Sequence, residues 1–352
     1  MPHVPGFLER LYVLRANRAP GSIYDLLGAG TLKSVALAAE VGLFDALADA
    51  PATPDELADA LDAHPDSLVL LCDFLVRTGY LDRDGGAFSL SPLSERWMVG
   101  EVSLVDWFVF WDRVVFPFWD DTAAEVVRTG EPDRTVYEWL GDNENRWPSA
   151  QRGFEATARL TLPAVIDAID LSGVERVLDA GGGHGRYTIG LCESAPGVSA
   201  TIADDPAALA VADENVTAAG LGDRIETRGV DLLTDELGTG YDLALVFNVV
   251  HGFDPTENRR LFDRLFDALA PGGRIVVLDQ FEGSGPVATA RTMNALVGLN
   301  YRILLGGRVY PYESIAGWLE SAGFTSPSRT NLRRAPGVSL ATARRPTTPE
   351  RT

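Results

Sequence analysis

Apolar positions in the first hundred residues recur with the three- and four-residue spacing of amphipathic helices. Thr53, Pro54 and Glu56 form a capping-box sequence, which places the start of a helix at Pro54. After an irregular arm, the pattern predicts helices at about residues 22–28, 31–50, 54–61 and 66–78.

Residues 80–90 predict a β-hairpin with an Asp84-Gly85 turn. Helices followed by a hairpin predict a winged-helix unit, and we expect residues 1–100 to form one mostly helical domain. The helix at 66–78, where a DNA-binding winged helix would read bases, carries two aspartates against a single arginine, Arg77. Duplex DNA requires clustered basic side chains. We therefore expect this domain to pair two chains in a homodimer.

The next segment, residues 101–165, combines helical spacing with many aromatic residues. One interpretation is ordinary core and dimer packing. The other is a linker or lid whose rings line a flat, apolar substrate pocket. The candidate wall residues are Trp111 and Phe154 in this segment, with Met293 and Asn294 further along the chain.

From residue 166 to 345 short apolar runs alternate with helical segments, as in α/β domains. Pro271-Gly272-Gly273 predicts a turn before the fifth strand, and the polar tail at 346–352 is expected to be frayed. The prediction is a Rossmann-like, mostly parallel sheet with helices on both faces. Strands are expected at 176–180, 199–203, 225–228, 243–248 and 274–278, followed by a helix at 312–322 and strands near 326–332 and 337–342.

The chain of 352 residues has a formal net charge of -20, and Lys33 is its only lysine. An acidic surface repels nucleic acid and anionic membranes, so we expect neither as a partner. Two explanations of the acidity stay open. One is adaptation to a salt-rich cytoplasm, where screening removes self-repulsion. The other is a GC-rich genome that favours aspartate and arginine codons.

The sequence contains no apolar run near the roughly 18 residues of a membrane helix. Its first twenty residues lack the features of a secretory signal, so a cytoplasmic location is expected. Cys72 and Cys192 fall on apolar helix faces and are expected to be reduced core residues. The four histidines lack metal-ligand spacing, so no structural metal is expected.

The segment 177–186 contains the end of a short apolar strand, a glycine-rich turn and the start of a helix. The glycines follow G-x-G-x-G, whereas a dinucleotide fingerprint would need a third glycine where Arg186 stands. The observed spacing is typical of S-adenosylmethionine (SAM) methyltransferases. A site for another nucleotide and a merely structural turn stay as alternatives. Gly181 and Gly183 let the backbone approach a ligand closely. The carboxylate of Asp179 would suit the cationic amino-acid tail of SAM.

Carboxylates also follow the second and third predicted strands, at the sheet edge where ligands of such folds bind. Asp204 is placed to accept both ribose hydroxyls, with Asp205 as its rival one residue later. Both could instead cap the helix that follows. After the third strand, Asp231 could accept from an adenine amino group while Leu232 flanks the ring.

His251 follows the fourth strand, where a substrate should meet the methyl donor. An imidazole titrates near neutrality and could take a proton from an attacking hydroxyl. Asp279, at the end of the fifth strand, could orient the imidazole and stabilise its cation. A purely structural or helix-capping histidine is the alternative. His184, inside the glycine turn, is interpreted as structural.

Several segments resemble the small-molecule O-methyltransferases of the plant caffeate and acetylserotonin type and of the bacterial polyketide type. The resemblance extends from about Leu32 to Ala343. It rests on the segments VLDAGGGHG, ADDP, GVDLL, VVHGFDPTENRRLF, LAPGGRIVVLD and GGRVYPYESIAGWLESAGF.

The resemblance implies a winged-helix dimerisation domain, a SAM-binding domain and a small-molecule substrate. It implies that Asp204 holds the ribose, that Asp231 with Leu232 holds the adenine, and that His251 beside Asp279 is the general base. The candidate cofactor-binding residues are Asp179, Gly181, Gly183, Asp204, Asp231, Leu232, Phe247 and Phe253.

Two departures from the plant pattern bear on the chemistry. Plant members have His-Asp-Trp where this chain has His251-Gly252-Phe253, and Val309 stands near the place of a second glutamate. The leading prediction is O-methylation of a small aromatic or apolar hydroxyl compound. Methylation of nitrogen or carbon, a SAM-dependent hydroxylation, a catalytically decayed SAM-binding dimer and a winged-helix regulator stay as alternatives.

Overall fold

The computed structural model describes residues 6–143, 146–283, 287–332 and 338–347. The chain divides into two compact units. Unit 1 comprises Met1–Phe116 with Arg152–Thr157, and unit 2 comprises Pro117–Gln151 with Ala158–Thr352. The aromatic segment 101–165 is therefore divided between the two units.

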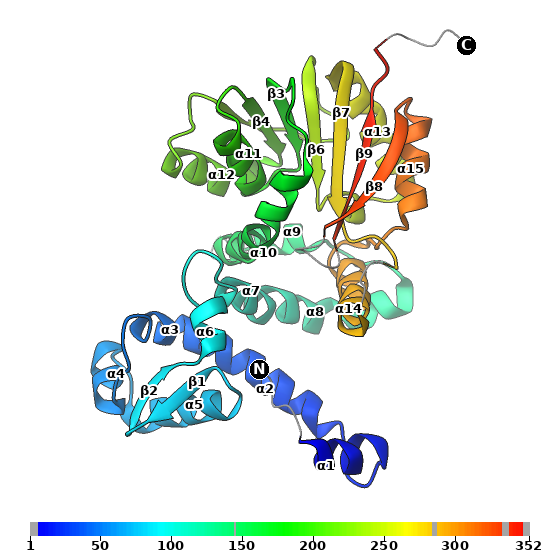
Figure 1. Cartoon of the computed structure of the whole chain (residues 1–352). Coiled ribbons are helices and arrows are strands. Elements are labelled where there is room, and N and C mark those ends of the chain that lie inside the picture. The colour runs from blue at the N-terminus through cyan, green and yellow to red at the C-terminus, as the bar shows by residue number, and fades with distance from the viewer. Residues whose placement is uncertain (1–5, 144–145, 284–286, 333–337, 348–352) are drawn as a thin grey trace. The chain divides into compact units, whose positions relative to one another are not determined.

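Unit 1 is mainly helical and contains one two-stranded hairpin among its described residues (Figure 1). The strands, β1 and β2, are antiparallel, and Gly85 and Gly86 between them both have positive φ, as a tight hairpin turn requires. The elements are α1 (Phe7–Glu9), the π-helix η1 (Arg10–Arg15), α2 (Ile23–Glu40), α3 (Leu43–Ala46), α4 (Pro54–Ala60), α5 (Pro65–Arg77), β1 (Leu81–Asp84), β2 (Ala87–Leu90), α6 (Pro92–Trp97), α7 (Val105–Phe110) and the π-helix η2 (Trp111–Val115).

The winged-helix prediction is confirmed in its elements, with two local corrections. The capping box at α4 forms, because the Thr53 side chain accepts from the Glu56 N–H and the Glu56 carboxylate accepts from the Thr53 N–H. The predicted break between 28 and 31 is wrong, since α2 runs continuously and the helix stops instead at Gly42, with φ +79°. Leu70, an apolar residue of the helix predicted at 66–78 that the sequence pattern places on its inner face, is 73% exposed.

Unit 2 contains a seven-stranded sheet in the order β5-β4-β3-β6-β7-β9-β8. The strands β3 to β7 are parallel, and β9 runs antiparallel to both β7 and β8. The strands are β3 (Arg176–Ala180), β4 (Ser199–Asp204), β5 (Ile225–Gly229), β6 (Tyr241–Phe247), β7 (Leu269–Asp279), β8 (Thr325–Asn331) and β9 (Ser339–Arg344). The order reverses between β3 and β6, which creates a switch point at their carboxyl ends.

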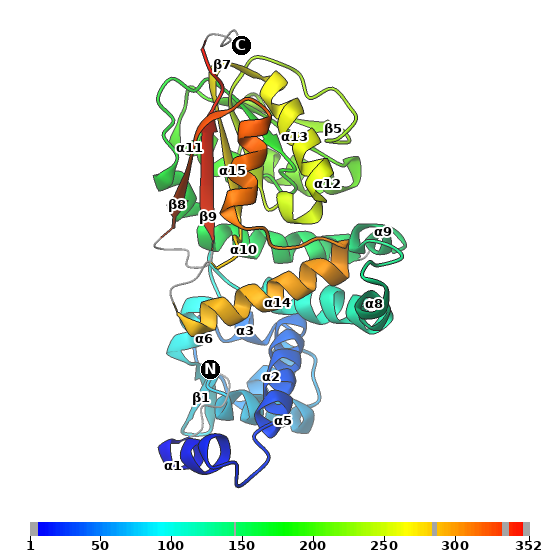
Figure 2. The same cartoon turned by 90° about the vertical axis from the view of Figure 1, so that its right-hand side faces the viewer.

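Helices cover both faces of this sheet, as predicted. One buried core joins the strands to α10, α11 and α12, and a second joins them to α13 and α15, which lie together along one side in Figure 2. The helices are α8 (Phe116–Thr129), α9 (Val136–Gly141), α10 (Arg146–Ala168), α11 (Arg186–Ser194), α12 (Pro206–Ala218), the short 3-10 turn η3 (Val250–Gly252), α13 (Pro255–Ala268), α14 (Ala288–Leu305) and α15 (Tyr312–Ser321).

Three further features of unit 2 refine the sequence prediction. The helix α14 was not predicted at all, and it supplies part of the site described below. The turn expected at 271–273 lies inside β7, which begins at Leu269 and has a register shift against β6. Cys192 is buried and free, as is Cys72 in unit 1, so the prediction of reduced core thiols is confirmed. Most of the tail predicted to be frayed, 346–352, lies outside the described residues.

Candidate active site

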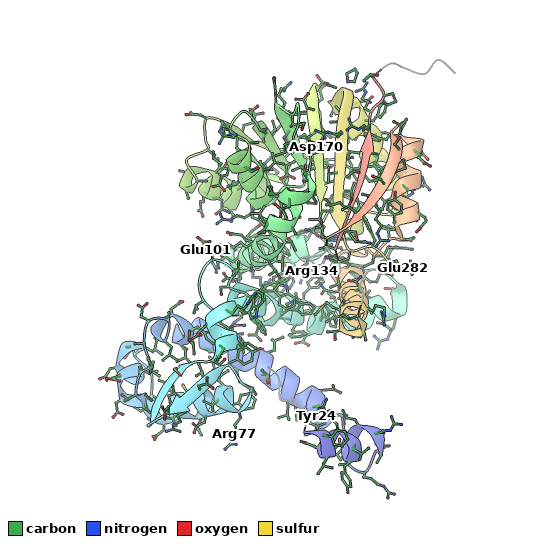
Figure 3. The ribbon with its side chains drawn as sticks, viewed as in Figure 1. Tyr24, Arg77, Glu101, Arg134, Asp170 and Glu282 are labelled. Atoms are coloured by element: carbon green, nitrogen blue, oxygen red, sulfur yellow. The ribbon has the colours of Figure 1, made fainter. Side chains whose placement is uncertain are left out.

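The carboxyl ends of β3, β4 and β6 bring the glycine turn and its carboxylates together. Gly183 has φ +48°, a left-handed conformation that favours glycine, and its N–H donates to Asp204 Oδ2 at 2.8 Å. The turn then enters α11 at Arg186. Glu282, labelled in Figure 3, follows β7 and marks the same edge of the sheet.

Asp179 lies beneath this turn and is almost completely buried. Its Oδ2 accepts the Thr188 hydroxyl at 2.6 Å, while its Oδ1 has no hydrogen-bond partner among the described residues. Burial raises the pKa of this carboxyl to about 7, against the lowering effect of the Thr188 hydrogen bond, and the charge of Asp204 raises it further. A cationic ligand group would satisfy the unpaired oxygen and offset the cost of the buried charge.

The structure separates the two neighbouring aspartates after β4. Asp205 is the N-cap of α12, with its Oδ1 accepting the Ala207 N–H at 2.8 Å. Asp204 turns toward the glycine loop instead, and burial raises its pKa to about 6 although the N–H groups of Gly183 and Asp205 lower it. Of the two aspartates, Asp204 is therefore the one whose carboxylate binds the backbone of the glycine loop.

The remaining cofactor candidates differ in their exposure and in their contacts. Asp231 is exposed. Its Oδ1 accepts a hydrogen bond from the Leu233 N–H at 2.7 Å, and this bond lowers the pKa of the Asp231 carboxyl. The buried Leu232 packs against the loop, since its Cδ1 lies 3.6 Å from where a Cβ on Gly181 would be. Phe247 is a core residue behind the loop, edge-on to Tyr187. Phe253 is half-buried, and its carbonyl accepts the Tyr310 hydroxyl at 2.7 Å.

His251 and Asp279 lie together at the ends of β6 and β7. The imidazole Nδ1 lies 3.1 Å from Oδ1 and 3.0 Å from Oδ2 of Asp279, and both side chains are buried. An ionised carboxylate only accepts, so a neutral imidazole in this pair carries its proton on Nδ1 and keeps a lone pair on Nε2. His184, by contrast, has a structural environment, because its Nδ1 accepts the Arg186 N–H and its carbonyl accepts the Asn215 side chain.

Two contacts that sequence reasoning missed hold His251 in place. The Tyr301 ring, from α14, stacks on the imidazole with centroids 3.5 Å apart and an interplanar angle of 2°. The Arg308 N–H donates to the His251 carbonyl at 2.9 Å, and a Cβ on Gly307 would lie only 1.9 Å from that carbonyl oxygen. Only glycine allows this approach. The GGR segment in the sequence was a signal for a close backbone contact, but its partner could not be inferred.

The four candidate wall residues are divided between the units. In unit 1, Trp111 packs on Trp107 with centroids 5.8 Å apart, and Phe154 packs on Phe110 at 5.0 Å. In unit 2, Met293 and Asn294 lie on α14, where Met293 is 40% exposed. Their part in a substrate pocket stays a prediction.

Within the described ranges, no group of three or more His, Cys, Asp or Glu side chains is arranged to hold a metal ion. None of the helices in the described part of the chain combines the length and the apolar character that crossing a membrane requires.

The residues at the loop fit the cofactor expected from the sequence. The unpaired Asp179 oxygen suits a cationic group. A Cβ on Gly183 would lie 3.8 Å from Asp204 Oδ2, so the missing side chain leaves room beside that carboxylate. Together with the strand order, these features define the class: a Rossmann-like methyltransferase that uses SAM.

Comparison with known families identifies the chain more closely. A model of the O-methyltransferase domain matches residues 124–325, and a model of the O-methyltransferase dimerisation domain matches residues 26–100. The chain therefore belongs to the O-methyltransferase family, whose small-molecule enzymes the sequence resembled.

Two curated relatives span most of both chains. The chain is 32% identical to the 3-hydroxy-5-methyl-1-naphthoate 3-O-methyltransferase of Streptomyces sahachiroi, over 91% of this chain and 93% of the relative. It is 26% identical to the L-tyrosine C(3)-methyltransferase of Streptomyces lavendulae, over 86% of each. Human N-acetylserotonin methyltransferase in complex with SAM has the same fold, with a TM-score of 0.80 at 22% identity, covering 99% of this chain and 100% of that structure.

Proposed function

We propose that this enzyme transfers the methyl group of SAM to a hydroxyl oxygen of a small aromatic metabolite, with His251 as the general base. The observation that carries the proposal is the buried His251–Asp279 pair, with Nδ1 within 3.0 Å of Asp279 Oδ2, at the same sheet edge as the glycine loop. An oriented imidazole there can accept a hydroxyl proton.

Bound SAM would supply an electrophilic methyl group for in-line displacement. His251 Nε2 would take the hydroxyl proton as the substrate oxygen attacks the methyl carbon. The buried carboxylate of Asp279 would hold the ring in the productive tautomer and stabilise the imidazolium. The Tyr301 ring would add a cation–π contact to that imidazolium. The proton then passes to solvent, and the methyl ether leaves with S-adenosylhomocysteine (SAH).

Binding roles are proposed for the loop residues and for the candidate wall. Asp204 would accept the ribose hydroxyls and Asp231 the adenine amino group, with Leu232 and Phe253 flanking the nucleoside. Trp111 and Phe154 are the aromatic candidates from which an aromatic acceptor is inferred. The naphthoate O-methyltransferase of Streptomyces sahachiroi, at 32% identity, supports this class of acceptor.

We also propose that the enzyme works as a homodimer in the cytoplasm. The match to a dimerisation domain at 26–100 supports pairing. In addition, unit 1 exposes large apolar side chains at its N-terminal helices, including Phe7, Leu8 and Leu26. The free thiols of Cys72 and Cys192 are consistent with a reducing compartment.

A product assay tests the proposed reaction and the acceptor atom together. The enzyme is incubated with SAM labelled with ¹³C at the methyl group and with a panel of hydroxylated naphthoates, benzoates and quinones. The NMR shift of the labelled carbon distinguishes an ether from an amine or a carbon-bound methyl. We expect an ether. A product methylated on carbon, as the tyrosine C(3)-methyltransferase relative makes possible, or on nitrogen would refute oxygen as the acceptor.

A further inference from the structure

Gln151 is a buried polar residue with no assigned role. It lies on α10 and is 3% exposed, and its Oε1 has no hydrogen-bond partner among the residues that the structure describes. Buried amide oxygens are almost always paired in folded proteins, because an unpaired one loses its hydration without compensation. The missing partner therefore points to a ligand or a solvent molecule at this position.

The amide oxygen borders the glycine loop. A Cβ on Gly183 would lie 3.9 Å from Gln151 Oε1 and 3.8 Å from Asp204 Oδ2, so the two oxygens flank the space that the absent side chain leaves. The neighbouring residue, Gly182, lies closer still to Asp179: a Cβ there would be 2.6 Å from Asp179 Oδ2, the oxygen that accepts the Thr188 hydroxyl.

Oxygen acceptors from three elements thus surround two consecutive glycines. Gln151 comes from α10, Asp179 from β3 and Asp204 from β4. Two of these side chains, Gln151 and Asp179, each present a buried oxygen that no described residue pairs. An ammonium group has three donors and no acceptor, so it suits unpaired oxygens of this kind, and the Asp179 carboxylate favours its charge.

We propose that Gln151 binds the amino-acid end of SAM and of its product SAH, with Oε1 accepting from the α-ammonium group. This inference rests on the proposed function, because it assumes SAM at the glycine loop. It assigns the two ends of the cofactor to different side chains. Gln151 and Asp179 would bind the amino-acid tail. Asp204 and Asp231 would bind the nucleoside.

Ligands with and without the tail separate this role from a general structural one. We would measure calorimetric binding of SAM, SAH and 5′-methylthioadenosine, which keeps the nucleoside and the sulfur but lacks the amino acid. Gln151→Met removes the amide at similar length, and Arg152→Leu changes the next residue of α10, whose side chain is 54% exposed, as a control. Thermal unfolding of each variant checks that it is folded.

For Gln151→Met we expect SAM and SAH to bind about 10- to 100-fold more weakly, the range for a lost hydrogen bond to a charged group. Binding of 5′-methylthioadenosine and all binding by Arg152→Leu should be unchanged. Equal losses for all three ligands, or no loss, would overturn the assignment.

A second variant covers the case in which Gln151→Met fails to fold. Gln151→Glu keeps an acceptor and adds a negative charge, so at pH 8 it should raise the affinity for SAM relative to 5′-methylthioadenosine. An unchanged ratio would contradict the proposal. If the folded wild-type protein bound neither SAM nor SAH, the proposed function itself would fail. If wild type bound both ligands and the Gln151 substitutions left their affinities unchanged, only the role of Gln151 would fail.

Discussion

The imidazole of His251 lies parallel to the phenol ring of Tyr301, with centroids 3.5 Å apart and 2° between the planes. The Tyr301 hydroxyl donates to the Gln280 side chain, and the Gln280 N–H donates to Asp279 Oδ1 at 2.8 Å. Asp279 in turn binds His251, so the four residues form a closed ring of contacts. Such a ring fixes both the plane and the tautomer of the imidazole.

Removing the stacked ring should impair turnover more than cofactor binding. Tyr301→Leu is expected to lower kcat by about 10- to 100-fold, because small misplacements of a catalytic group cost rates of that order. Tyr301→Phe keeps the stack and should stay within a few-fold of wild type. Steady-state kinetics with SAM binding measured in parallel checks both. Equal losses in the two variants would mean that the hydroxyl, and not the stack, matters.

The burial of Asp179 predicts an unusual effect of pH on stability. Its pKa rises from about 3.8 in the unfolded chain to about 7 in the folded protein, so between these values the folded state holds a proton that the unfolded state lacks. Its contribution to the free energy of unfolding therefore falls as pH rises through this window. Above about pH 7 the folded protein carries the full cost of a buried carboxylate.

Asp179→Asn should therefore stabilise the SAM-free protein at alkaline pH. We expect a higher Tm than wild type at pH 8 and a smaller difference at pH 5, where the wild-type carboxyl is already protonated. The same variant should bind SAM more weakly at pH 8, because the cation loses its counter-charge. Differential scanning calorimetry at both pH values tests the effect, and a Tm difference that does not change with pH would contradict it.

The close approach of Gly307 to His251 predicts a position-specific defect. A Cβ there would collide with the His251 carbonyl oxygen at 1.9 Å, so Gly307→Ala must move the turn that carries the base. We expect kcat to fall by about tenfold or more. Gly317→Ala on α15, where a Cβ meets nothing within 4 Å, should leave kcat unchanged and match or exceed wild-type stability. Wild-type kcat in Gly307→Ala would refute the constraint.

The apolar face of the N-terminal helices predicts where dimerisation can be broken. Tyr24, labelled in Figure 3, ties α2 to α1 through its hydroxyl, which donates to Glu9 at 2.7 Å. Leu8 and Leu26 nearby in sequence are 76% and 66% exposed. A double Leu8→Asp, Leu26→Asp variant should be monomeric by light scattering, whereas Val127→Asp on α8, at a side chain 75% exposed, should not change the oligomeric state. A dimer in the double variant would place the interface elsewhere.

Sequence patterns predicted the fold well where local signals and tertiary packing agree. The sequence pattern predicted all seven strands of the sheet, six of them to within two residues, whereas β7 begins five residues before its predicted start. The capping box at Thr53 determines the start of α4 through local hydrogen bonds. The positive φ that Gly85 adopts allows the tight turn of the hairpin. The helix boundary at 28–31 was misplaced because glycine inside a helix costs only about 1 kcal/mol, which packing of α2 easily offsets. Gly42, with its positive φ, was the true break.

The site was predictable only as far as topology determines it. Asp179, Asp204 and His251 follow strands whose carboxyl ends must meet, so the sequence could place them together. Tyr301 and Gln151 lie on α14 and α10, far away in the sequence, and no spacing rule links a helix residue to a loop across such a distance. Their roles depend on side-chain packing that only coordinates reveal.

The most direct test of the central claim compares His251→Gln with His184→Gln, the histidine in a structural environment. For each variant we would measure kcat at saturating aromatic acceptor together with the calorimetric affinity for SAM. If His251 is the general base, His251→Gln lowers kcat by about 10²- to 10⁴-fold at nearly unchanged SAM affinity, and a folded His184→Gln retains far more turnover. Wild-type kcat in His251→Gln would show that methyl transfer proceeds without this base.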